Sequence, residues 1–224
     1  MFLHKHPYPP FIPKNADRLI VGTLPPPRFT TGELLEQDVD FCYGSYYNSL
    51  WLYIDAIHQL NLRFDNSVEA VNQRKAYLKT HRIGVCDIVA SAERSKIDAS
   101  DLGMTAVKLR DVIGCLKQCP KVKTLLFIGG NSKNGPEYFF RRQLKAYGLK
   151  LEVIEKETPR IHQFKLPDVL DSGQERVIKT VSLTSSSGAA NISISRNPLY
   201  QQLKAKKPKF NTFDFRVLQY REYL

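Results

Sequence analysis

A serine-rich stretch late in the chain has the residue types of an anion-binding loop. Ser185, Ser186 and Ser187 follow an apolar run that ends at Leu183, and they precede an amphipathic segment that begins near Asn191. Small residues before a helix present backbone N–H groups and hydroxyls to a phosphate. The alternative is a plain serine-rich turn capped by Asn191. The stretch therefore predicts either a phosphate-binding loop or a surface turn.

An aromatic segment at residues 41–51 has the composition of a surface that contacts a nucleobase. Tyr46 and Tyr47 belong either to the core or to a platform on which an extruded base stacks, an interaction worth about 1–3 kcal/mol per base. Asn48 stands at the expected start of a helix, where its ordinary role is to cap the backbone. Its carboxamide could instead orient a water molecule or read the edge of a base.

A third loop, at residues 22–28, has the composition of a rigid ligand-binding edge. Gly22 ends a short apolar run, and Thr23, Leu24 and Pro25 follow before two more prolines. Glycine allows a ligand to approach the backbone closely, and prolines stiffen the chain. Rigid loops are also common as purely structural connections. Taken alone, this loop fits both readings.

Four short apolar runs predict the strands that must position these loops. They span residues 19–21, 83–89, 125–128 and 177–183. Continuous apolar runs bounded by turn residues are typical of a parallel sheet that is covered on both faces. Helical stripes of apolar residues lie between the runs. This alternation predicts an α/β fold with right-handed crossovers, in which ligands bind beyond the carboxyl ends of the strands.

The 224 residues fit a single domain, with two segments outside the alternating pattern. Residues 150–176 are expected to form an extra strand and a surface excursion. Residues 204–224 are expected to form a basic and aromatic C-terminal tail. The lysines of this tail either contact a nucleic acid or form a solvated charge run: Lys204, Lys206, Lys207 and Lys209.

Composition favours a polyanionic partner. The chain has 33 Lys and Arg against 22 Asp and Glu, a net charge of +11, which is typical of a nucleic-acid-binding protein. No apolar stretch approaches the roughly 18 residues that cross a bilayer. The four cysteines are irregularly spaced, which favours reduced thiols over a metal site. We therefore expect a cytoplasmic monomer without metal.

Taken in order, these segments resemble the uracil-DNA glycosylase superfamily, nearest to its mismatch-specific and hypoxanthine-DNA branches. Residues 22–25 resemble the first motif of that family, G-x-x-P, and residues 46–51, YYNSLW, resemble the motif that follows it. Residues 84–98 resemble the second strand of the hypoxanthine branch, including Asp87. Residues 183–191 resemble the closing loop that grips the DNA backbone. The resemblance covers residues 16–200.

This resemblance implies a three-layer α/β/α domain with a four-stranded, mainly parallel central sheet. It implies removal of a deaminated base, uracil or hypoxanthine, after the base is flipped out of DNA, with no metal or organic cofactor. It assigns the placed water or a base contact to Asn48, and Asp87 either orients a polar group at the pocket or pairs with Arg94. Further base contacts are assigned to Gly22, Thr23, Leu24, Pro25, Tyr46 and Tyr47. Contacts to the DNA backbone are assigned to Ser185, Ser186, Ser187 and Asn191, with the four tail lysines.

The sequence departs from the family pattern at several positions. Leu24 stands where the best-known branches have a catalytic Asp or Asn, and Thr184 stands where a proline is expected. These departures make a non-catalytic nucleic-acid-binding protein of the same fold the first alternative. A hydrolase of free nucleosides or nucleotides is the second, although it has no use for a charge of +11. The base removed and the preference for single or double strands stay open.

Overall fold

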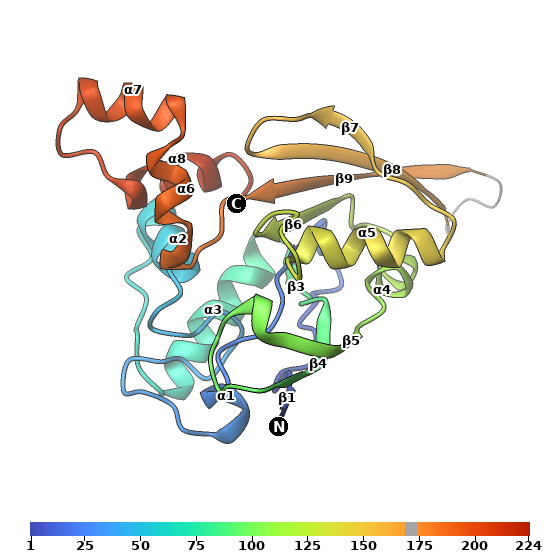
Figure 1. Cartoon of the computed structure of the whole chain (residues 1–224), viewed down its shortest axis with the longest axis horizontal. Coiled ribbons are helices and arrows are strands. Elements are labelled where there is room, and N and C mark those ends of the chain that lie inside the picture. Colours follow the sequence, from blue (N-terminus) through green and yellow to red (C-terminus); the bar gives the residue numbers. More distant parts are fainter. Residues whose placement is uncertain (169–173) are drawn as a thin grey trace.

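The computed structural model describes residues 1–168 and 174–224 and contains a six-stranded sheet with the strand order β3-β2-β6-β9-β8-β7 (Figure 1). Four neighbouring strands are parallel, and each lies in one of the predicted apolar runs. They are β3 (Ile83–Val85), β2 (Arg18–Val21), β6 (Thr124–Ile128) and β9 (Glu175–Leu183). The predicted α/β class with a mainly parallel central sheet is therefore confirmed.

Two antiparallel strands extend the sheet beyond the four that were predicted. β8 (Arg160–Pro167) pairs with β9, and β7 (Glu152–Glu155) pairs with the other side of β8. The segment 150–176 thus supplies two strands to the central sheet, where one strand and a surface excursion were expected. Phe164 and Leu166 are buried on alternate positions of β8, a period of two that is typical of a strand. Residues 169–173 of the expected excursion lie outside the described residues.

Helices cover both faces of the sheet and make three layers. Along β2, Ile20 packs into one core, whereas Leu19 and Val21 pack into the other, because successive residues of a strand point to opposite faces. The core around Ile20 is closed by α2 (Leu50–His58), α3 (Val68–Thr80) and α8 (Thr212–Arg221). The opposite core is closed by α4 (Val112–Gln118) and α5 (Pro136–Ala146).

The apolar run 83–89 was expected to be one strand, and the structure divides it between two sheets. β3 ends at Val85, and β4 (Val89–Arg94) joins a separate antiparallel sheet with β1 (Phe2–Lys5) and β5 (Met104–Leu109). This second sheet was not predicted. The division leaves Asp87 in the short loop between β3 and β4, just beyond the carboxyl end of β3.

The C-terminal segment forms helices, where a tail was expected. α8 is capped by Asn211 and Asp214, and its Val217 and Tyr220 pack into the core beside α2, so apolar burial holds this segment in place. Two further helices, α6 (Asn191–Ser195) and α7 (Pro198–Lys206), stand away from the sheet (Figure 1).

Three short helical turns complete the described elements: α1 (Arg28–Thr31), η1 (Asp101–Gly103) and η2 (Gly188–Ala190). Two of them, η1 and η2, follow directly on loops that reach the carboxyl end of the sheet. No helix in residues 1–168 and 174–224 is both long and apolar enough to cross a membrane.

Candidate functional site

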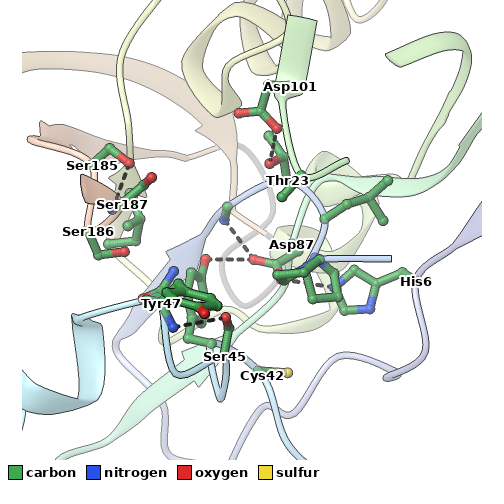
Figure 2. A pocket seen from close by; sticks show the side chains of 18 of the residues that line it. His6, Thr23, Cys42, Ser45, Tyr47, Asp87, Asp101, Ser185, Ser186 and Ser187 are labelled. Carbon is green, nitrogen blue, oxygen red and sulfur yellow. Dashed lines mark hydrogen bonds and ion pairs between the residues drawn. The ribbon is translucent and has the colours of Figure 1, made fainter. Parts of the chain in front are cut away.

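A pocket of about 440 Å³ lies at the carboxyl ends of the four parallel strands (Figure 2). The loops after β2, β3 and β9 line it, together with Ile128 at the end of β6. Ligands of open α/β sheets bind at this edge, because the connections there diverge and leave a crevice. Its volume lies within the range of about 300–1,000 Å³ that is usual for small-molecule sites.

Most of the residues singled out from sequence line this pocket, and several do not. Tyr46 is half-exposed outside the pocket, with its ring 5.3 Å from that of Tyr47. Asn191 lies at the start of α6, away from the lining. The four lysines are exposed on α7 and the loop after it. The predicted residues in the lining are Gly22, Thr23, Leu24, Pro25, Tyr47, Asn48, Asp87, Ser185, Ser186 and Ser187.

The carboxylate of Asp87 is buried at the base of the pocket and both its oxygens are engaged. Oδ1 accepts hydrogen bonds from the Gly22 N–H at 2.7 Å and from the Tyr43 hydroxyl at 2.6 Å. Oδ2 lies 2.9 Å from Nε2 of His6, whose Nδ1 accepts the N–H of Tyr8, so the imidazole proton lies on Nε2 and donates to Asp87. Burial raises the pKa of Tyr43 well above its usual range, so its hydroxyl remains a donor.

The predicted pairing of Asp87 with Arg94 is absent from the described residues. Arg94 is buried in the second sheet, where its Nε donates to Nδ1 of His4 at 2.8 Å and its Nη1 donates to the Ser100 carbonyl at 2.6 Å. The guanidinium therefore anchors the loop before η1. The alternative role of Asp87, the orientation of polar groups at the pocket, fits the contacts observed.

Gly22 is required by this arrangement because there is no room for a side chain. A Cβ atom at this position would lie 2.3 Å from the Tyr43 hydroxyl oxygen and 3.0 Å from Oδ1 of Asp87. Tyr43 has a positive φ of 59°, a conformation that costs a bulky residue roughly 1–3 kcal/mol. The backbone strain at Tyr43 brings its hydroxyl to Asp87.

A second carboxylate, Asp101, faces the pocket from η1. Its Oδ1 accepts a hydrogen bond from the Thr23 hydroxyl at 2.8 Å. Burial, which removes water from the charged form, raises the pKa of the Asp101 carboxyl, and this outweighs the Thr23 hydrogen bond and the charge of Arg94. Sequence reasoning stopped at Asp98 and missed Asp101. It also missed His6, for which the local sequence gives no signal, and Tyr43, which belongs to the aromatic segment 41–51 but was not singled out within it.

Asn48 lies on the lining beside the start of α2 and has a capping contact. Its Oδ1 accepts the Leu50 N–H at 3.0 Å, whereas Ser49, the N-cap residue, makes no side-chain capping bond. In the described part of the chain its Nδ2 makes no hydrogen bond, so the amide nitrogen is available to a ligand. Tyr47 next to it is 68% exposed and offers a ring face at the pocket mouth.

The carbonyl groups of the serine loop are engaged by α8 and by the start of α2, where the Ser186 carbonyl accepts the Ser49 N–H at 3.1 Å. The buried Arg216 donates to the carbonyls of Ser185 and Ser187, both at 3.0 Å. Ser186 is 1% exposed and its buried hydroxyl has no hydrogen-bond partner among the described residues, where the N–H groups of Ser185 and Ser186 also donate to nothing. A loop with unused donors and a guanidinium behind it is suited to binding an anion.

The pocket lining is acidic and aromatic, and the Cys42 thiol in it is uncharged. It contains Asp87 and Asp101, and no Lys or Arg among the described residues. Burial raises the pKa of the Cys42 thiol, which is therefore protonated and unreactive at neutral pH. In the same described part of the chain, no three His, Cys, Asp or Glu residues are grouped as metal ligands. The pocket thus favours a ligand that develops positive charge.

The fold has a counterpart among solved structures. The chain is similar to the solution structure of a protein from Methanosarcina acetivorans that is described as a candidate uracil DNA glycosylase, with a TM-score of 0.52 and 18% sequence identity. The similarity covers 96% of this chain and 99% of that one. No protein-family model matches the chain, and no curated protein does. The likeness shows that the two chains share a fold.

Proposed function

We propose that this protein is a DNA glycosylase that hydrolyses the N-glycosidic bond of a deaminated base, uracil or hypoxanthine, flipped out of DNA. The main support is the combination of an acidic and aromatic pocket with the donor-rich loop of Ser185, Ser186 and Ser187 at its edge. A flipped nucleotide has matching parts, since its base enters a pocket while its phosphates remain at the surface. The fold shared with a candidate uracil DNA glycosylase and the net charge of +11 agree with this proposal.

The pocket suits the charge changes of this reaction. As the bond breaks, the base gains electrons and the sugar becomes oxocarbenium-like. The buried carboxylate of Asp87 favours the positive sugar electrostatically. Tyr47 stacks against the extruded nucleotide, and the serine loop holds the neighbouring phosphates.

In this proposal Asn48 orients the attacking water. The second lone pair of its Oδ1 and its unpaired Nδ2 are both available, and the contact of Oδ1 with the Leu50 N–H holds the side chain in one orientation. A carboxamide is a weak base, so it orients water without deprotonating it. This is sufficient when the sugar is already close to a cation.

Excision from labelled oligonucleotides that contain uracil, hypoxanthine or xanthine tests the proposal. The parent protein should release at least one of these bases and leave an abasic site. Asn48→Ala should slow that release by about 100-fold or more, the size expected for loss of one positioned transition-state contact. Because the substitution also removes a capping contact worth about 1 kcal/mol, thermal melting must show that the variant is folded.

Asn48→Asp is the matched control, because a carboxylate keeps the contact with the Leu50 N–H and offers water a true base. If Asn48 acts only as a helix cap, Asn48→Asp and a folded Asn48→Ala variant should both release the base at the parent rate. That result would remove Asn48 from the mechanism.

A non-catalytic DNA-binding protein is the second candidate. Leu24 favours it, because its side chain packs against the core below the sheet and gives the pocket an apolar wall where a polar group is expected. A parent protein that binds DNA but releases no base from any of the three substrates establishes this reading in place of the first.

A further inference from the structure

The two carboxylates of the pocket differ in how many hydrogen bonds they already accept from the protein, and therefore in their capacity to bind a ligand. Asp87 receives three hydrogen bonds from the protein and is almost fully buried. Asp101 receives one, from Thr23 to Oδ1, and among the described residues Oδ2 accepts no hydrogen bond and forms no ion pair within 4 Å. Asp101 is only partly buried and lines the pocket, so its free oxygen is accessible to a ligand that donates a hydrogen bond.

The backbone around Asp101 is held rigidly. The buried side chain of Asn134 donates to the Asp101 carbonyl at 2.9 Å and to the Met104 carbonyl at 3.1 Å. On the other side Arg94, 1% exposed, donates to the carbonyl of Ser100. Two buried side chains therefore fix the position of one carboxylate, which is the support that a recognition group needs to select between similar ligands.

A second unsatisfied polar group in the same lining is the Ser186 hydroxyl, buried and without a partner. Figure 2 shows the serine loop and Asp101 on different sides of the pocket, with Asp87 on a third. The lining thus offers both a free acceptor and a free donor. With the serine loop assigned to phosphate, Asp101 Oδ2 is the acceptor left for the base, and deamination creates a matching donor, the ring N–H at N3 of uracil or N1 of hypoxanthine.

We propose that Asp101 is the specificity-determining residue of the pocket and accepts a hydrogen bond from the ring N–H of the extruded base, N3–H of uracil or N1–H of hypoxanthine. Cytosine and adenine have a lone pair at that ring position, which a carboxylate repels. The inference rests on the proposed function, because it assumes that the pocket receives a base. It assigns Asp101 to recognition and leaves the water to Asn48.

Binding to strands that cannot be cleaved tests this role separately from excision. The probes are fluorescent single-stranded oligonucleotides with one 2′-fluoro-2′-deoxyuridine, or with the same nucleotide methylated at N3, and a second pair with 2′-fluoro-2′-deoxyinosine and its N1-methyl form. For the base that the parent binds more tightly, methylation should weaken binding by about 10- to 100-fold, because a buried hydrogen bond to a charged acceptor is lost.

Asp101→Asn should reduce that ratio to near 1. With the Thr23 hydroxyl still donating to the amide oxygen, the amide nitrogen takes the place of Oδ2 and faces the ring N–H as a second donor. Asp98→Asn is the matched control, since Asp98 lies in the same loop outside the pocket lining, and it should keep the parent ratio. Melting curves establish that both variants are folded.

The outcomes separate the two proposals. A methylation ratio near 1 in the parent, or an equal ratio in the parent and Asp101→Asn, overturns the role of Asp101 whether or not a base is released. Absence of excision with the predicted ratios overturns only the glycosylase activity. A parent that binds none of the probes overturns both.

Discussion

Gly22→Ala should disrupt the hydrogen-bonded group around Asp87. The added methyl would lie 2.3 Å from the Tyr43 hydroxyl oxygen, and the Tyr43 side chain is held by the core and by its contact with Asp87. Relief requires that the hydroxyl leave the carboxylate. A hydrogen bond to a charged group is worth about 1.5–3 kcal/mol, and overpacking a core costs about 1–3 kcal/mol more. The expected loss of unfolding free energy is therefore about 2.5–6 kcal/mol.

Thermal and urea unfolding measure this loss. In a domain of this size 1 kcal/mol corresponds to about 2–4 °C, so Tm should fall by roughly 5–24 °C. Excision or binding should fall with it, because Asp87 no longer holds the pocket side of the β2 loop. Gly188→Ala is the control, since a Cβ atom there meets nothing within 4 Å and the same change should be nearly neutral.

A double-mutant cycle tests the stated cause. In the Tyr43→Phe background the hydroxyl is absent, and the nearest atoms to the new methyl are then about 3.0 Å away, at the ring and at Asp87. Gly22→Ala should cost at least 1 kcal/mol less in that background than in the parent. Equal costs in both backgrounds would refute the clash with Tyr43 as the explanation.

Two further predictions concern pH and salt. Burial lowers the pKa of His4 from 6.5 to about 4, so between these pH values the unfolded chain takes up a proton that the folded chain excludes. The contribution of His4 to the unfolding free energy should therefore be fully present above pH 6.5 and should fall by up to about 3 kcal/mol as the pH drops to 4. Urea unfolding at several pH values measures this loss, which should be smaller in His4→Gln. For DNA binding, changing the four lysines of α7 and its following loop to Gln should reduce the slope of log affinity against log salt by several units, because fewer counterions are released. If the slope stays as steep as in the parent, the DNA contact lies elsewhere. The lysines changed are Lys204, Lys206, Lys207 and Lys209, and the control set, around the far ends of α4 and α5, is Lys117, Lys121, Lys145 and Lys150.

The four parallel strands and the sheet edge that carries the candidate pocket were predictable from the sequence. Strands covered on both faces must be apolar at every position, so the runs containing Leu19 and Leu125 were recognisable as strands from their local sequence alone. Parallel strands place the loops that follow them at one edge, which brought Gly22, Asn48 and Ser186 to one pocket as expected from their order in the chain.

Other features were misjudged where local pattern was ambiguous. The run 83–89 is apolar throughout, yet it changes sheet at Cys86, because β4 finds its partners in β1 and β5. The C-terminal residues looked like a tail because their apolar side chains lack a strong helical stripe. Burial against α2 gives α8 its place, with Tyr53 and Tyr220 rings 5.1 Å apart.

The sequence by itself determined the four parallel strands, their order along the chain and the edge of the sheet where the candidate pocket lies, since these follow from local composition and from parallel topology. Only the tertiary structure decided which polar groups meet there. Asp87 is joined to His6, 81 positions away, and to Tyr43, 44 positions away, whereas Arg94, seven positions along, turns to His4. Hydrogen bonds act over about 3 Å and depend on direction, so their partners are fixed by how distant segments pack and not by their spacing in the chain.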